Sequence, residues 1–203
     1  MNSADATRLR TFLAVEVAAP IHAALVELKN ELARVASAVR WVRDDGLHAT
    51  IKFLGYVAPT QLEAILQTLT PLVRSFPAFT VRVHGLGVFP TLRRPRVIWV
   101  GLDGPELPQL ARVIDQGIVP LGFPPEARPF QAHLTLGRVQ GPRGWSRLEE
   151  ALKARWIDDF GSCSITELIA YRSDLRPEGA VYTKLWTIPF EESRRGVPDG
   201  PGH

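Results

Sequence analysis

Residues 47–54 read Leu-His-Ala-Thr-Ile-Lys-Phe-Leu, and residues 131–138 read Gln-Ala-His-Leu-Thr-Leu-Gly-Arg. Both stretches contain the pattern His, apolar, Thr, apolar, as His48-Ala49-Thr50-Ile51 and His133-Leu134-Thr135-Leu136. On a β-strand, residues two apart point to the same face and lie about 6.6 to 6.9 Å apart. Each stretch therefore places an imidazole beside a hydroxyl on one face of a strand. Two such strands facing each other across a cleft would put a histidine on each side of a bound group.

The rest of the chain alternates between helical and strand-like patterns. Apolar stripes predict helices over residues 20–35, 60–72, 107–118 and 146–152, the second behind a capping pair, Thr60 and Glu63. Strand-like runs cover Thr11 to Val17, Leu47 to Leu54, Phe79 to His84, Val97 to Val100, Gln131 to Arg138, Ser164 to Tyr171 and Val181 to Ile188. These elements predict an α+β fold with a largely antiparallel sheet framework and helices on one side of each sheet.

Length and composition indicate a globular chain. The 203 residues are 45% hydrophobic and 22% charged, which excludes a disordered or collagen-like protein. We expect one domain over residues 9–190, with flexible tails at residues 1–8 and 193–203. No stretch approaches the roughly 18 consecutive apolar residues of a membrane span. The single cysteine, Cys163, excludes an internal disulfide and favours a reducing compartment, so a cytoplasmic location is expected.

The paired histidines suit phosphate-ester chemistry at a ribose. Such a reaction needs a base for the attacking oxygen and an acid for the leaving oxygen, and imidazoles serve both roles near neutral pH. Threonine hydroxyls can hold nonbridging phosphate oxygens or the attacking water. No carboxylate shares a strand face with either motif, so neither a metal nor another cofactor is expected. The net charge of +3 gives a weak preference for an anionic partner.

The two motifs and their surroundings resemble the two-histidine phosphoesterase superfamily, in particular its RNA 2′,3′-cyclic phosphodiesterases, once called 2′-5′ RNA ligases (LigT-like). The resemblance covers nearly the whole chain and includes residues 10–14, Trp41, residues 85–90, residues 95–99 and the closing strand from Tyr182 to Leu185. It implies a bilobal α+β fold of two pseudo-symmetric antiparallel sheets with outer helices and a central cleft.

The resemblance also implies roles for individual residues. His48 and His133 match the catalytic histidines, and Thr50 and Thr135 match the threonines of the same motifs. Two further substrate-binding positions match the aromatic residue that stacks on a nucleobase and the arginine that binds phosphate: Phe53 and Arg138.

Strict strand alternation disagrees with the last two assignments. Phe53 and Arg138 lie an odd number of residues from their histidines and would point to the opposite face. A β-bulge near Gly55 and Gly137 would remove the conflict. Without one, the side chains beside the histidines would be Lys52 and Gln131, so Lys52 is a further substrate-binding candidate.

The function implied by the resemblance is hydrolysis of a terminal ribose 2′,3′-cyclic phosphate on RNA or a nucleotide to a 2′-phosphate. The resemblance favours His133 as general base and His48 as general acid, whereas the residues alone are symmetric. Two alternatives stay open: the reverse reaction, which joins ends through a 2′-5′ linkage, and an RNA- or nucleotide-binding module without turnover. The expected partner is RNA or a nucleotide, and no obligate protein partner is evident.

Overall fold

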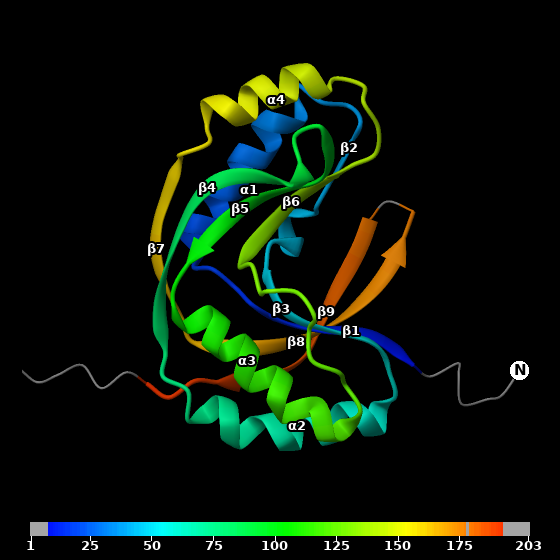
Figure 1. Cartoon of the computed structure of the whole chain (residues 1–203), viewed down its shortest axis with the longest axis vertical. Coiled ribbons are helices and arrows are strands. Elements are labelled where there is room, and N and C mark those ends of the chain that lie inside the picture. Colours follow the sequence, from blue (N-terminus) through cyan, green and yellow to red (C-terminus); the bar gives the residue numbers. More distant parts are fainter. Residues whose placement is uncertain (1–7, 178, 193–203) are drawn as a thin grey trace, which may run out of the picture.

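The protein is described by a computed structural model that covers residues 8–177 and 179–192. Strands and helices alternate along this part of the chain, which confirms the α+β class (Figure 1). The elements are β1 (Leu9–Val15), α1 (Ala19–Ala33), β2 (Val39–Trp41), η1 (Asp44–Gly46), β3 (Ala49–Val57), α2 (Pro59–Arg74), β4 (Phe79–Thr91), β5 (Arg94–Asp103), α3 (Glu106–Ile118), η2 (Val119–Leu121), β6 (His133–Val139), α4 (Trp145–Ala154), β7 (Asp159–Ile165), β8 (Glu167–Arg176) and β9 (Gly179–Pro189). Except for Arg8, the expected tails at residues 1–8 and 193–203 lie outside the described residues.

The strands form one continuous antiparallel sheet rather than the two sheets that the sequence led us to expect. Within the described residues the order is β7-β4-β5-β6-β3-β1-β8-β9, and β2 pairs with the last residues of β6, on the edge that faces β3. The two halves meet through a single paired position, Ala49 with Leu134. Because so little pairing joins the halves, each keeps its own curvature, and the sheet is curled rather than flat.

The two halves are related by a pseudo-two-fold operation. Outward from the junction, the strands run β3-β1-β8-β9 on one side and β6-β5-β4-β7 on the other. The helices α2 and α3 pack against the first half, while α1 packs against β7 and β2 in the second. Figure 1 shows α1 and α4 at one end of the molecule and α2 and α3 at the other.

Some local expectations need correction. Helix α2 begins at Pro59, and the backbone N–H of Ala58 donates to Oε1 of Gln61 at 3.2 Å, so Thr60 and Glu63 do not form the cap. Proline fits the first helical position because its fixed φ suits a helix and its missing N–H would have no partner there. The strand expected from Ser164 to Tyr171 is divided between β7 and β8, and β2 was not predicted.

Apolar side chains gather on both faces of strand β1. Leu13 belongs to the main core between the sheet and its helices, whereas Phe12 and Ala14 belong to a small separate cluster with Ile169 and Tyr171. Successive residues of a strand point to opposite faces, so this second cluster marks the face turned away from the main core. We call it the site face, because it contacts His48.

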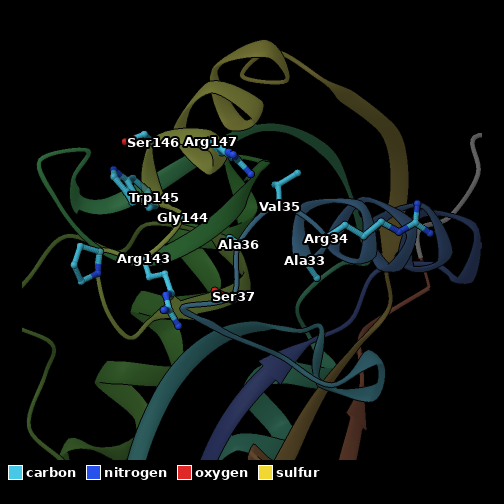
Figure 2. A pocket seen from close by; sticks show the side chains of 11 residues that line it. Ala33, Arg34, Val35, Ala36, Ser37, Arg143, Gly144, Trp145, Ser146 and Arg147 are labelled. Carbon is cyan, nitrogen blue, oxygen red and sulfur yellow. The ribbon is translucent and has the colours of Figure 1, made fainter.

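The ends of two helices leave a hollow beyond the β2–β6 ladder. A pocket of about 600 Å³ lies where α1 ends and α4 begins (Figure 2). None of the helices in the described residues has the length and apolarity needed to cross a membrane.

Candidate active site

The junction of the two half-sheets brings the two His-x-Thr motifs together. Ala49 and Leu134, the middle residues of the motifs, are antiparallel partners. Extending this register by one residue each way sets His48 opposite Thr135 and Thr50 opposite His133. Opposite residues of an antiparallel pair have Cβ atoms about 4.5 to 5.5 Å apart, and diagonal ones about 7 to 8 Å. The two imidazoles therefore lie diagonally across the junction, a separation that one phosphate group can bridge.

A β-bulge in β3 places Phe53 on the site face. In the ladder with β1, Phe53 is opposite Phe12 and Thr50 is opposite Ala14, which leaves Ile51 as an extra residue. The extra residue reverses the alternation, so Phe53 points to the same side as Thr50. The ring of Phe53 is 5.9 Å from that of Phe12, and the side chain is 53% exposed. The ring is thus available to a ligand beside His48.

Strand β6 contains the corresponding bulge. Against β5, Thr135 is opposite Trp99 and Arg138 is opposite Val97, with Leu136 as the extra residue. Trp99 and Val97 are two residues apart on a regular strand, so Thr135 and Arg138 share one face. Arg138 is close enough to His133 for its charge to lower the pKa of that imidazole. Phe53 and Arg138 thus occupy equivalent positions after the two motifs.

Lys52 does not face the site, so the expectation from strict alternation is wrong. Lys52 is opposite Leu13 and points into the space under α3, because the bulge turns it away from His48. Its ammonium group lies 2.7 Å from Asp115 of α3 and donates to the carbonyl of Pro124 at 2.8 Å. The backbone N–H of Glu126 donates to the same carboxylate at 3.0 Å. Lys52 therefore fixes the loop that leads to His133.

His48 is packed among aromatic rings. Its imidazole stacks on Phe12 at 4.7 Å and on Tyr171 at 5.5 Å, and it meets the edge of Tyr182 at 4.8 Å. Burial lowers the pKa of His48 to about 4, and the negative charge of Glu16 opposes this shift. In the free protein His48 is therefore neutral at neutral pH.

His133 is held by the backbone in one tautomer. Its Nδ1 lies 2.8 Å from the carbonyl oxygen of Gln131, which can only accept, so Nδ1 carries the proton and donates. Phe89 meets the ring edge-on at 5.1 Å. Burial lowers the pKa of His133, although the hydrogen bond to Gln131 opposes this. The neutral ring thus has a free lone pair on Nε2. Gln131 contributes its backbone carbonyl here.

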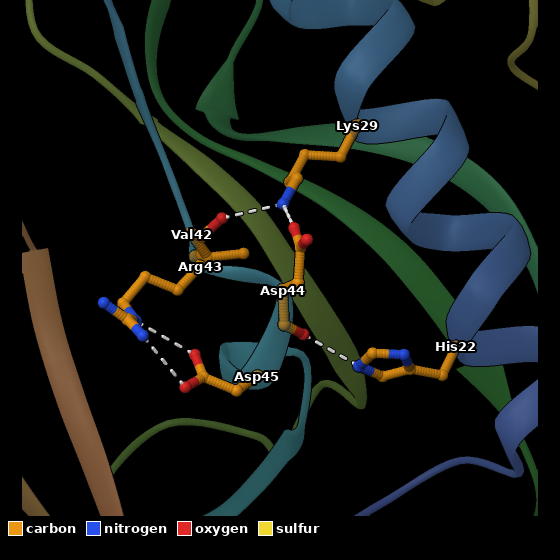
Figure 3. Close-up of polar contacts among 6 residues, drawn as sticks. All are labelled: His22, Lys29, Val42, Arg43, Asp44 and Asp45. Carbon is orange, nitrogen blue, oxygen red and sulfur yellow. Dashed lines mark hydrogen bonds and ion pairs between the residues drawn. The ribbon is translucent and has the colours of Figure 1, made fainter.

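The segment before His48 is anchored to helix α1. Lys29, which is buried, forms an ion pair with Asp44 and donates to the carbonyl of Val42 at 3.1 Å (Figure 3). Nε2 of His22 donates to the backbone carbonyl of Asp44 at 2.8 Å. These contacts fix η1 immediately before the motif. In the other half, Asp115 of α3 pairs with Lys52 of β3, and both also contact the backbone of the loop before His133, at Glu126 and Pro124.

Several residues around His48 carry no recognisable sequence motif. The carboxylate of Glu16 accepts from the hydroxyl of Tyr171 and pairs with Lys184 at 2.8 Å. Burial acts to raise the pKa of Glu16, but hydrogen bonds from Lys184 and Tyr171 lower it below its ordinary value. These side chains, with Tyr182, line a pocket of about 470 Å³ next to the imidazole. Their only sequence signal is an aromatic or charged residue on a predicted strand, which is common on strands of any protein.

The arrangement can be compared with known proteins. The sequence profile described as LigT like Phosphoesterase matches residues 15–99 and again residues 100–182. An RNA 2′,3′-cyclic phosphodiesterase of Methanothermobacter thermautotrophicus is 34% identical over 179 residues, covering 88% of this chain and 97% of that protein. A second RNA 2′,3′-cyclic phosphodiesterase, from Thermotoga maritima, is 30% identical over 185 residues, covering 90% of this chain and 96% of that protein.

Solved structures share the fold over nearly the same range. TT0787 of Thermus thermophilus superimposes with a TM-score of 0.77 at 28% identity, covering 91% of this chain and 100% of that one. Escherichia coli LigT, solved with 3′-AMP, superimposes with a TM-score of 0.70 at 26% identity, covering 90% of this chain and 98% of that one. The two matched repeats agree with the pseudo-two-fold arrangement of the strands.

The profile match over both halves and the shared fold identify the class as the two-histidine phosphoesterases. The chain belongs to the LigT-like phosphoesterase family, which confirms the resemblance inferred from its motifs.

Proposed function

We propose that this protein hydrolyses a terminal ribose 2′,3′-cyclic phosphate on RNA or a nucleotide, leaving a 2′-phosphate and a free 3′-hydroxyl. The observation that carries the proposal is the pairing of Ala49 with Leu134, which sets His48 and His133 diagonally across one junction. The relatives named RNA 2′,3′-cyclic phosphodiesterase support the choice of substrate.

His133 is the general base in this proposal. The carbonyl of Gln131 holds the proton on Nδ1, which leaves the lone pair of Nε2 to accept a proton from water. The water oxygen then forms a bond to phosphorus while the bond from phosphorus to O3′ breaks. His48 donates its proton to O3′, so it must be protonated in the complex. The negative charge of the bound phosphodiester raises its pKa from the low value of the free protein.

The remaining residues on the site face bind the substrate. The hydroxyls of Thr50 and Thr135 donate to the nonbridging phosphate oxygens, and Arg138 adds a charge-assisted contact as negative charge develops there. Phe53 offers its exposed ring to the terminal base. After turnover His133 is protonated and His48 neutral, so proton exchange with solvent restores the starting state.

The test is incubation of chelator-treated protein with RNA that ends in a 2′,3′-cyclic phosphate, followed by mapping of the product end. We expect a 2′-phosphate, formed at the same rate in excess EDTA because acid, base and phosphate ligands are all side chains. Within the described residues, no cluster of three or more His, Cys, Asp or Glu side chains is placed to hold a metal ion. A rate that vanished with EDTA and returned with a divalent ion would overturn the mechanism.

The same assay separates the two alternatives. Adding RNA with a 5′-hydroxyl end tests for a 2′-5′ junction, since hydrolysis and ligation share one transition state. Binding of the cyclic end without any product would identify a binding module and contradict the proposed hydrolysis.

A further inference from the structure

The pocket between α1 and α4 is strongly basic. Arg34 at the end of α1 and Arg143 and Arg147 at the start of α4 lie around it, and none of its lining residues is Asp or Glu (Figure 2). All three side chains are exposed. Among the ion pairs and side-chain hydrogen bonds of the described residues, none engages these guanidinium groups. Figure 2 shows the Arg34 side chain directed away from Arg143 and Arg147, and together the three groups make this end of the molecule positively charged.

A short ladder connects this pocket to the candidate active site. Strand β2 pairs with β6 so that Arg40 is directly opposite Arg138, and opposite residues point to the same face. Gly137 permits this close pairing, because a Cβ there would lie 2.7 Å from Val39 and 2.9 Å from Trp41. Arg40 and Arg138 therefore extend the site face beyond His133.

The ladder leads directly into the pocket. The backbone N–H of Gln140 donates to the carbonyl of Ala38 at 2.8 Å, and the pocket lining begins at the neighbouring Ser37 and Pro142. Arg138 and Arg40 thus lie on the ladder, and Arg34, Arg143 and Arg147 lie in the pocket lining just beyond its end. We call the set Arg138, Arg40, Arg34, Arg143 and Arg147 the basic track.

We propose that the basic track binds the phosphodiester backbone of an RNA strand whose cyclic phosphate end occupies the junction between His48 and His133. Guanidinium groups bind phosphate oxygens through two parallel hydrogen bonds, and Trp145 in the pocket lining offers a ring on which a base can stack. The inference rests on the proposed function and deepens it, because it assigns a polymer rather than a cyclic mononucleotide as the preferred substrate.

The experiment compares two substrates and two matched variants. The test variant carries Arg143→Gln and Arg147→Gln, and the control carries Arg74→Gln and Arg112→Gln, exposed arginines of α2 and α3 at the other end of the molecule. Both variants lose two positive charges, so a general effect of net charge is cancelled. The substrates are an RNA dodecamer ending in a 2′,3′-cyclic phosphate and 2′,3′-cyclic AMP.

We expect the test variant to raise KM for the dodecamer about tenfold and to leave kcat unchanged, because only binding away from the reacting phosphate is lost. A plot of log KM for the dodecamer against the logarithm of the salt concentration should have a slope smaller by about 1.4 in the test variant than in the wild type. This is the value for two single-strand phosphate contacts. Hydrolysis of 2′,3′-cyclic AMP should be unchanged, as should both reactions of the control variant. An equal rise in KM for both substrates, or no rise for either, would overturn the proposal.

Binding measured without turnover keeps the two proposals apart. Fluorescence anisotropy of a labelled dodecamer ending in a 2′-phosphate should show the same tenfold weakening in the test variant even if no hydrolysis were found. An Arg143→Lys and Arg147→Lys variant should retain most of the affinity, which excludes a folding defect. If inorganic phosphate stabilised the wild type but not the test variant, while dodecamer binding was equal in both, the pocket would be a site for a free anion and the proposal would fail.

Discussion

At the scale of single residues, burial controls how the two histidines titrate. His48 lies among aromatic rings and His133 lies against Phe89, so both imidazoles lose hydration when charged and both have lowered pKa values. The reaction nevertheless needs one imidazole neutral and the other protonated. In the free protein that combination is most populated between the two pKa values, and both lie below the ordinary value of 6.5.

The first prediction concerns pH. A plot of kcat/KM against pH should be bell-shaped with its maximum below pH 6.5, because kcat/KM reports the free enzyme, in which both pKa values are lowered. Above both values it should fall about tenfold per pH unit. In Glu16→Gln the limb of the profile that reports His48 should move to lower pH, because the carboxylate that raises the pKa of His48 is removed. A constant kcat/KM from about pH 6 to 9 would show that no protonated imidazole is needed.

The second prediction concerns Phe53. Stacking of a base on an aromatic ring contributes about 1 to 3 kcal/mol, so Phe53→Ala should weaken nucleotide binding by roughly 5- to 150-fold. The pH profile should stay the same, because the ring does not transfer protons. Tyr56→Ala removes another exposed ring of the same strand and serves as the control, with affinity expected to be unchanged. Calorimetric titration with a 2′-nucleotide measures both, and equal affinity in wild type and Phe53→Ala would refute the stacking role.

At the scale of elements, the two bulges decide which residues reach the site. The pattern His, apolar, Thr, apolar was enough to predict the strands β3 and β6 and the placing of an imidazole beside a hydroxyl on one face. It was not enough to place the fifth residue after each histidine. The extra residues, Ile51 and Leu136, are defined only by the register against β1 and β5, strands distant in sequence. A purely local pattern contains no information on that register, so alternation wrongly favoured Lys52.

The position of Lys52 gives the third prediction. Lys52→Met should lower the free energy of unfolding by about 3 kcal/mol, because it leaves the Asp115 carboxylate without its buried partner. Adding Asp115→Leu should restore much of the loss, since replacing both members of a buried pair by apolar residues is often nearly neutral. Lys153→Met removes an exposed pair within α4 and should cost about 0.5 kcal/mol or less. Urea unfolding measures the free energy of unfolding of all three variants. Equal decreases for Lys52→Met and Lys153→Met would contradict the structural role of the buried pair Lys52 with Asp115.

At the scale of the whole molecule, the curled sheet turns two distant stretches of sequence into one site. Each half-sheet supplies one motif, and the single pair Ala49 with Leu134 joins them. Figure 1 shows the helices at the two ends of the molecule, with the junction of the half-sheets between them. Sequence patterns predicted the duplicated strands and most of the helices, whereas the two separate sheets implied by the resemblance are joined here into one sheet by the single pair Ala49 with Leu134. The two histidines should therefore act as one unit.

The most direct test measures turnover of RNA ending in a 2′,3′-cyclic phosphate by His48→Ala, His133→Ala and the double variant, with His84→Ala as control. Each single variant should lose about 10²- to 10⁴-fold in kcat, the usual effect of removing a general acid or base, and His84→Ala should keep its activity. The double variant should be no slower than about the worse single variant, because groups that act as a unit are not additive. Near-normal turnover by either single variant, or losses that multiply in the double variant, would contradict a shared two-histidine site.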